Sequence, residues 1–134
     1  MKELNGADMT FVFICAALVM FMIPGLALFY GGMVKSKNVL STTLHSYAAL
    51  IVISLQWIIV GYSLAFGPDI KGLIGNLDFV FFNNVTALPN TLYSSTIPKL
   101  LFAGFQMMFA MITAAVISGS FAERMRFPAF LIFI

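Results

Sequence analysis

One uncharged stretch, residues 100–122, limits most strongly what this chain can fold into. It contains no Asp, Glu, Lys or Arg, and the charged cluster Glu123, Arg124 and Arg126 follows it directly. A helix needs about 20 residues, at ~1.5 Å each, to cross the hydrocarbon core of a bilayer. The stretch therefore predicts a membrane-spanning helix over residues 97–122, with Pro98 in the first turn, where proline is tolerated.

Three further apolar segments extend this interpretation to the whole chain. Residues 9–32 and 40–66 are also free of charge and long enough to span a bilayer. Residues 127–134 are apolar, but eight residues cannot span, so we expect a fourth helix that is cut by the end of the chain. The sequence predicts an all-α, polytopic transmembrane helix bundle, with residues 1–134 as the N-terminal part of a single membrane domain.

The composition agrees with a membrane protein and argues against several other classes. The chain is 61% hydrophobic and 9% charged, whereas a typical soluble domain is ~25% charged. A net charge of +2, with no basic patch, argues against nucleic-acid binding. The single cysteine can form neither an intrachain disulfide nor a metal cluster. No catalytic triad, zinc motif, phosphate loop or carboxylate pair is present, so we predict neither an enzyme nor a bound cofactor or metal.

The distribution of charge between the loops predicts the orientation of the chain. The two short loops carry a net charge of +3, and the N-terminal end together with residues 67–96 carries −1. Lys and Arg accumulate in short cytoplasmic loops. The N-terminus and the long connection, residues 67–96, are therefore expected outside the cell. Residues 73–85 of that connection are apolar enough to form a short re-entrant or surface helix.

Two faces are visible on the predicted helix over residues 97–122. Phe102, Phe105 and Phe109 recur at helical spacing, with Gln106 beside them. The second face carries small residues, which allow another helix to approach closely. These residues are Ala110, Ala114, Ala115, Ser118 and Gly119. Phenylalanines at this spacing also commonly face lipid or a partner helix.

The aromatic face suits a small cation, or a neutral molecule derived from one. Ring faces attract cations by roughly 0.5–2 kcal/mol, whereas removing the hydration shell of an ion costs several kcal/mol. Two or three rings can therefore collect a cation at the mouth of a pore but cannot carry it through. A titratable cation can lose its proton instead, because desolvation favours the neutral form.

Three long segments carry a resemblance to a known family. They are PGLALFYGGMVKSKNVLS (residues 24–41), GYSLAFG (residues 61–67) and LLFAGFQMMFAMITAAVISGSFAERMRF (residues 100–127). In order and spacing they resemble the first three helices of the ammonium transporters. The resemblance implies an eleven-helix fold, an external N-terminus and a homotrimer with one pore per subunit.

The resemblance also implies roles for five residues of this chain. Phe109 resembles the first of two stacked rings that gate the pore, and Phe105 resembles an aromatic lining the external vestibule. Gln106 would be a supporting polar group beside them. Phe29 and Tyr30 resemble residues near the inner end of the pore. The second gate ring and the histidines, Asp, Trp and Ser of the family's pore would lie beyond Ile134.

The implied function is transport of ammonium or ammonia, with methylammonium as an analogue, across the cell membrane. Two alternatives stay open: an ammonium sensor of the same fold, and a non-transporting, truncated remnant that packs through its small-residue face. Besides membrane lipid, the resemblance implies a PII-type regulatory protein at the cytoplasmic face. His45 does not match a pore histidine, and a lone histidine near a helix end is usually an interfacial residue. The basic residues of the cytoplasmic face would be Lys35, Lys37, Arg124 and Arg126.

Overall fold

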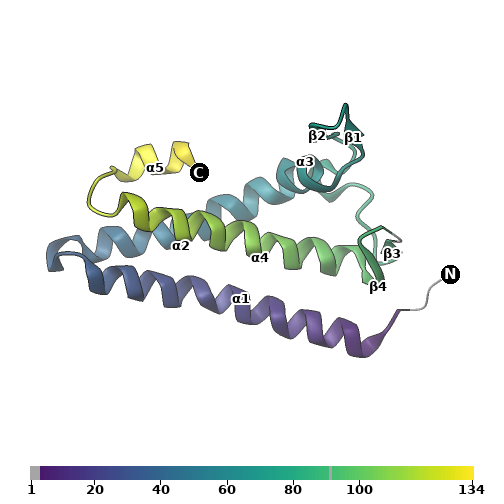
Figure 1. Ribbon diagram of the computed structural model, residues 1–134, viewed down its shortest axis with the longest axis horizontal. Helices are drawn as coiled ribbons and strands as arrows, with labels where there is room; N and C mark the ends of the chain where they lie inside the picture. Colours follow the sequence, from purple (N-terminus) through teal and green to yellow (C-terminus); the bar gives the residue numbers. More distant parts are fainter. Residues whose placement is uncertain (1–3, 91) are drawn as a thin grey trace. The chain divides into compact units, whose positions relative to one another are not determined.

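The computed structural model describes residues 4–90 and 92–134, with Asn90 described by its backbone alone, and is mostly helical (Figure 1). The α-helices follow one another along the chain in the order α1, α2, α3, α4 and α5. Three helical segments are long and apolar enough to cross a membrane: Gly6–Met33, Ser36–Phe66 and Lys99–Phe121. Only a continuous helix satisfies all of its backbone polar groups within one segment, which explains why uncharged runs of this length fold this way.

The first helix, α1, covers Gly6–Met33, starting before and ending after the predicted residues 9–32. The side chain of Asn5 accepts a hydrogen bond from the Ala7 amide at 2.9 Å, which caps the exposed amides of the first turn. Asp8 lies in that turn, where a negative charge interacts favourably with the helix dipole. The helix continues through Pro24 and ends before the 3-10 turn η1, Ser36–Asn38.

The second long helix changes its winding near its end. It consists of α2 (Val39–Gln56), the π-helical segment η2 (Trp57–Gly61) and α3 (Tyr62–Phe66). The indole N–H of Trp57 donates a hydrogen bond to the carbonyl of Ala103, at 3.2 Å. Gly61 suits the π-helical segment, because a Cβ there would lie 3.1 Å from the Trp57 ring. The Trp57 indole, which lies in the wider π-helical turn, therefore links the second long helix to α4 by a hydrogen bond.

The long connection folds into turns and small hairpins, so the prediction of a helix over residues 73–85 was wrong. Strands β1 (Asp69–Ile70) and β2 (Ile74–Gly75) pair antiparallel, and a single 3-10 turn, η3 (Val80–Phe82), follows. A second antiparallel pair, β3 (Pro89–Asn90) and β4 (Ser94–Pro98), leads into α4. Glycine, proline and asparagine favour turns over helix in this connection. Backbone angles with positive φ at Lys71, Phe81, Phe82 and Asn84 interrupt any continuous helix.

The last two helices are joined by a tight turn. Helix α4 covers Lys99–Ser118, continues as the 3-10 turn η4 (Gly119–Phe121), and is followed by α5 (Phe127–Phe133). Pro128 lies in the first turn of α5, where its missing amide hydrogen is not needed. Glu123, between the two helices, has a φ of 63°, which reverses the chain direction at a residue other than glycine.

The chain divides into two compact units that we describe separately. One unit combines the chain up to Ala17 with Leu55–Met107, and the other combines Leu18–Ser54 with Met108–Ile134. The core of the first is built around Tyr62 and Ala103. The core of the second contains Ile23, Ala27, Ala49, Met111, Ala115 and Phe130. The prediction of an all-α membrane fold is confirmed. The two short hairpins of the long connection are strands that this prediction did not include.

Candidate functional site

The three phenylalanines predicted to form one face of α4 differ in their surroundings. The Phe102 ring packs against Phe66 and Tyr93, with ring centres 5.2 and 5.9 Å apart. Phe105 is half-buried, and Phe109 is 44% exposed. Gln106 is also half-buried, between them in sequence. The stripe therefore begins in a packed aromatic cluster and ends at a ring that is partly exposed.

That aromatic cluster belongs to the unit that holds the long connection. The Tyr62 ring lies at its centre, 5.4 Å from Phe66 and 5.8 Å from Phe79. At its edge the ammonium group of Lys99 lies 3.4 Å from the centre of the Phe79 ring and donates a hydrogen bond to the Asn84 carbonyl at 3.3 Å. Lys99 is itself buried, so its charge is stabilised by a ring face and a carbonyl oxygen. The cluster fastens the connection to the start of α4.

The predicted residues of the inner pore end, Phe29 and Tyr30, have different roles in packing. Phe29 is 61% exposed, whereas Tyr30 is half-buried against α4 in the same unit. The Tyr30 hydroxyl donates a hydrogen bond to the Val116 carbonyl at 3.0 Å. Its ring lies over Gly119, where an added Cβ would come within 2.7 Å of the hydroxyl oxygen. The position of Tyr30 therefore depends on the absence of a side chain at Gly119.

Three of the five residues on the small-residue face of α4 are buried, and Ala110 and Gly119 are half-buried. Ala114, Ala115 and Ser118 are all buried in the second unit. The Ser118 hydroxyl donates to the Ala115 carbonyl at 2.7 Å, so the polar group is satisfied within its own helix. On the same helix, the backbone carbonyl of Val116 accepts the hydrogen bond from the Tyr30 hydroxyl of α1.

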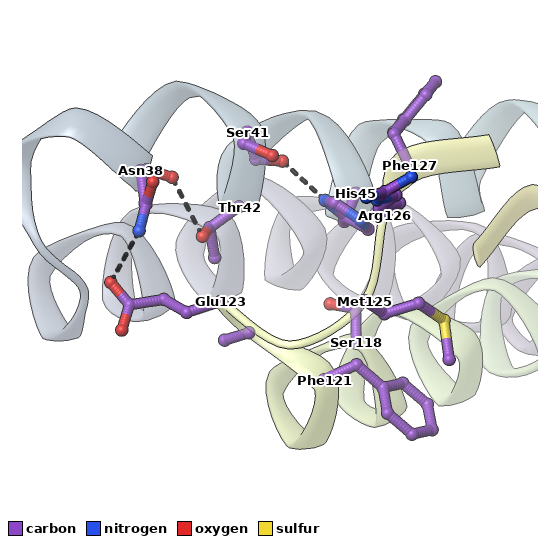
Figure 2. A pocket seen from close by; sticks show the side chains of 11 residues that line it. Asn38, Ser41, Thr42, His45, Ser118, Phe121, Glu123, Met125, Arg126 and Phe127 are labelled. Atoms are coloured by element: carbon purple, nitrogen blue, oxygen red, sulfur yellow. Dashed lines mark hydrogen bonds between the residues drawn. The ribbon is translucent and has the colours of Figure 1, made fainter. Parts of the chain in front are cut away.

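A contact between the two short loops was not visible in the sequence. The carboxylate of Glu123 accepts hydrogen bonds from the backbone amide of Lys35 and the side-chain amide of Asn38, each at 2.9 Å. These two hydrogen bonds, the one from Asn38 first, hold the pKa of the Glu123 carboxyl below its usual range, and Lys35 and Lys37 add a favourable charge effect. The contact joins the turn after α1 to the turn after α4 (Figure 2).

We expect this contact to make folding stability depend on pH. Because the pKa of Glu123 is lower in the folded protein, its contribution is present above the ordinary carboxyl value of 4.5 and is lost as the pH falls through the folded value. Replacing Glu123 with Gln should flatten this part of the pH profile. Thermal unfolding of the full-length protein at neutral pH and below 4.5 measures the effect, and an Asp69→Asn variant serves as the exposed control. An equal fall in unfolding temperature in both variants would contradict this role of Glu123.

A pocket lies beside this contact, within the same unit. Its cavity volume is about 240 Å³. It is lined by residues at the start of α2, in the turn after α4 and at the start of α5, as Figure 2 shows: Asn38, Ser41, Thr42, His45, Ser118, Phe121, Ala122, Glu123, Met125, Arg126 and Phe127. The pocket was not predicted, because its walls come from segments that are far apart in sequence.

His45 is the buried titratable residue of this pocket. It is only 8% exposed and lies between the rings of Phe127 and Phe130, at centre distances of 5.4 and 4.8 Å. Its Nδ1 lies 2.6 Å from the Ser41 carbonyl, and because a carbonyl oxygen only accepts, Nδ1 carries the hydrogen. Its Nε2 is buried without a hydrogen-bond partner. An unsatisfied buried acceptor costs about 1–3 kcal/mol, so this atom requires an explanation.

Within residues 4–90 and 92–134, no group of three or more His, Cys, Asp or Glu side chains is placed to hold a metal ion. The geometry offers aromatic rings along α4, a tyrosine anchored by its hydroxyl beside it, and a small pocket whose lining includes the Glu123 carboxylate and the Arg126 guanidinium. Of these groups, the ring faces can attract a small cation.

Comparison with known proteins relates the sequence of this chain to one protein family. Residues 10–134 match the family model described as the Ammonium Transporter Family. The chain is 56% identical over 126 residues to an "Ammonium transporter" of Bacillus subtilis (strain 168), covering 94% of this chain and 31% of that protein. It is 44% identical over 133 residues to an "Ammonium transporter" of Aquifex aeolicus (strain VF5), covering 98% of this chain and 31% of that protein.

Solved structures agree with the sequence comparison. The crystal structure of Saccharomyces cerevisiae Mep2 is similar with a TM-score of 0.82 and 36% sequence identity. The similarity covers 97% of this chain and 29% of that one. The chain thus spans a little under a third of the length of the relatives it matches.

Proposed function

Because this chain belongs to the ammonium transporter family, we propose that the full-length protein containing it transports ammonium or ammonia across the cell membrane. The observation that carries the proposal is the match along residues 10–134, which includes all three long apolar helices. A direct test is to express the full-length protein in cells that lack their own ammonium uptake. Uptake of labelled methylammonium, and growth on low ammonium, should both be restored, and failure of both at normal membrane expression would reject the proposal.

The proposed path uses aromatic residues from two helices of this segment. Phe109 is proposed as a gate ring, with Phe105 in the external vestibule and Gln106 as a supporting polar group. Phe29 and Tyr30 are proposed near the inner end of the pore. The exposure of Phe109 and Phe29 supports these roles, since a ring that meets substrate must not be covered by its own segment.

The energetics favour a recruitment step followed by loss of a proton. A ring face contributes roughly 0.5–2 kcal/mol to holding a cation, which is too little to offset removal of the hydration shell. A low-dielectric path also disfavours the charged form of the substrate. We therefore propose that ammonium is collected outside, gives its proton to water at the mouth of the path near Phe109, and passes the gate as ammonia.

The assembly and its partners are part of the same proposal. We propose a homotrimer in the cell membrane with one pore per subunit, and docking of a PII-type regulatory protein on the cytoplasmic face. Four exposed basic side chains would lie on that face: Lys35, Lys37, Arg124 and Arg126. Their charge supports both the proposed orientation and an interaction with anionic groups at the membrane surface.

The orientation itself can be tested with a native sequence motif. Asn84-Val85-Thr86 is an acceptor for N-linked glycosylation, and Asn84 and Thr86 are both exposed in the long connection. If that connection faces outward, the full-length protein inserted into eukaryotic microsomes should gain the mass of one glycan in this segment. Asn84→Gln should abolish that gain. A protein that stays unmodified, although an acceptor engineered at the N-terminus is modified, would show that the two segments lie on opposite sides.

A further inference from the structure

On the basis of the proposed transport function, we propose that Trp57 is a positioning residue for the external end of the path. Its indole fixes the turn of α4 that leads to Phe105 and Gln106, and so sets where these two side chains meet ammonium. All three residues belong to the same compact unit of the chain. Trp57 acts through this turn and does not itself contact the substrate.

The hydrogen bond of the Trp57 indole joins two helices that are far apart in sequence. Its N–H donates to the carbonyl of Ala103 at 3.2 Å, and Ala103 is completely buried. A carbonyl oxygen has two lone pairs, so it can accept from the indole as well as from an amide of its own helix. An indole N–H that loses its partner in apolar surroundings is costly. A rotation or shift of α4 that breaks this hydrogen bond is therefore unfavourable.

The Trp57 ring is held in place by its own part of the chain. It lies at the first position of η2, where Gly61 leaves room for it, because an added Cβ would lie 3.1 Å from a ring carbon. The rings of Tyr62 and Phe66 contact it, with ring centres 6.1 and 6.2 Å away. Short π-helical turns of this kind are frequent at functional sites. The indole is therefore a preorganised donor aimed at α4.

The carbonyl that accepts this hydrogen bond lies directly before the residues proposed for the external vestibule. Residues three positions apart on an α-helix lie on the same face, so Gln106 follows Ala103 along the helix surface, and Phe105 is its neighbour in sequence. A binding group works well only when it is held within about 0.5 Å of its productive position. Fixing this turn of α4 therefore fixes the vestibule residues.

A second contact acts on the same turn of α4. The Phe66 ring packs against the Phe102 ring of α4, with ring centres 5.2 Å apart, and it also contacts the Trp57 ring. Phe66 thus connects Trp57 to the residue that directly precedes Ala103. Because these ring contacts remain when the indole N–H is removed, its removal should loosen the turn without unfolding the helix.

The experiment removes the indole N–H of Trp57 alone in the full-length protein. Site-specific incorporation of 3-benzothienylalanine exchanges the N–H for sulfur and keeps the shape of the ring, and Trp57→Phe is a second variant without the donor. A fluorinated tryptophan at the same position retains the N–H and is the conservative variant. Ile53→Ala controls for stability, because it removes a buried side chain of α2 in the other compact unit.

Two measurements are made on each variant. Methylammonium uptake, corrected for the amount of protein, gives the KM and the maximal rate, and hydrogen exchange in lipid nanodiscs follows residues 103–109. Loss of one hydrogen bond should raise the KM about twofold to tenfold in the two variants without the donor. The maximal rate should stay parental, because the proposed gate ring Phe109 is unchanged. Amides of this turn should exchange faster by a similar factor.

The two control variants separate positioning from stability. The fluorinated tryptophan should keep the parental KM, and Ile53→Ala should lower the unfolding temperature without a change in KM. A parental KM in both variants without the donor would overturn the role of Trp57, as would an equal rise of KM in Ile53→Ala. A parent that takes up no methylammonium would instead reject the proposed function. In that case unchanged hydrogen exchange would also reject the fixing of α4 by Trp57, and faster exchange would support it.

Discussion

Replacing Phe109 with Ala in the full-length protein is expected to lower methylammonium uptake by about twofold to thirtyfold at substrate concentrations below saturation. This range corresponds to the roughly 0.5–2 kcal/mol that one ring face contributes to holding a cation. Phe109 is 44% exposed within this segment, so the loss of its ring removes surface that a substrate can contact. Initial rates of labelled methylammonium uptake, corrected for the amount of protein in the membrane, measure the effect.

The matched control for Phe109 is a phenylalanine that is also exposed but lies outside the proposed path. Phe21 of α1, 75% exposed, meets that description, and Phe21→Ala should leave the rate unchanged. Conversely, a Phe109→Ala variant with parental uptake at matched expression would remove Phe109 from the transport path. A uniform loss of membrane protein in both variants would instead indicate a packing defect, which the correction for protein amount reveals.

Replacing Gly119 with Ala should displace the Tyr30 ring and lower both stability and uptake. The new Cβ would lie within 2.7 Å of the Tyr30 hydroxyl oxygen, so the ring must move and its hydrogen bond to the Val116 carbonyl is lost. Forcing an extra carbon into a packed contact typically costs about 1–3 kcal/mol. Thermal unfolding and methylammonium uptake of the same preparation measure the two consequences.

A second substitution separates this mechanism from a general effect of alanine in a helix. Gly104, on the same helix, has no atom within 4 Å of an added Cβ, so Gly104→Ala should be neutral or slightly stabilising. In a Tyr30→Ala background, Gly119→Ala should have little further effect, because the clashing ring is already absent. Additive losses in that double variant would show that Gly119 acts through something other than Tyr30.

Much of the helical architecture could be predicted from the sequence, for a simple physical reason. A charge-free run long enough to cross a bilayer has few alternatives to a helix, since each of its backbone polar groups must be satisfied within the segment. The spacing of the small residues also placed Ala114, Ala115 and Ser118 on one side of the helix, and the structure shows all three buried. The motifs in residues 24–41, 61–67 and 100–127 were sufficient to predict the family.

The long connection shows where this reasoning failed. Its apolar residues 73–85 suggested a helix, but apolar content without a helical period does not determine secondary structure. The chain there forms short hairpins and turns, and the Phe79 and Phe82 rings pack around Tyr62. The connection thus folds back onto α3, the helix that precedes it, and this packing of rings is not visible in the sequence pattern.

The sequence by itself determined the three long apolar helices and the family. Only the tertiary structure decided that Glu123 binds the loop after α1, that Gly119 makes room for Tyr30, and that His45 is buried in the wall of a pocket. Helix formation depends on contacts a few residues apart, which a linear pattern records. The first two of these features connect residues that are more than 70 positions apart in the sequence, and the third is a cavity wall built from several segments. Such contacts exist only after the helices have packed.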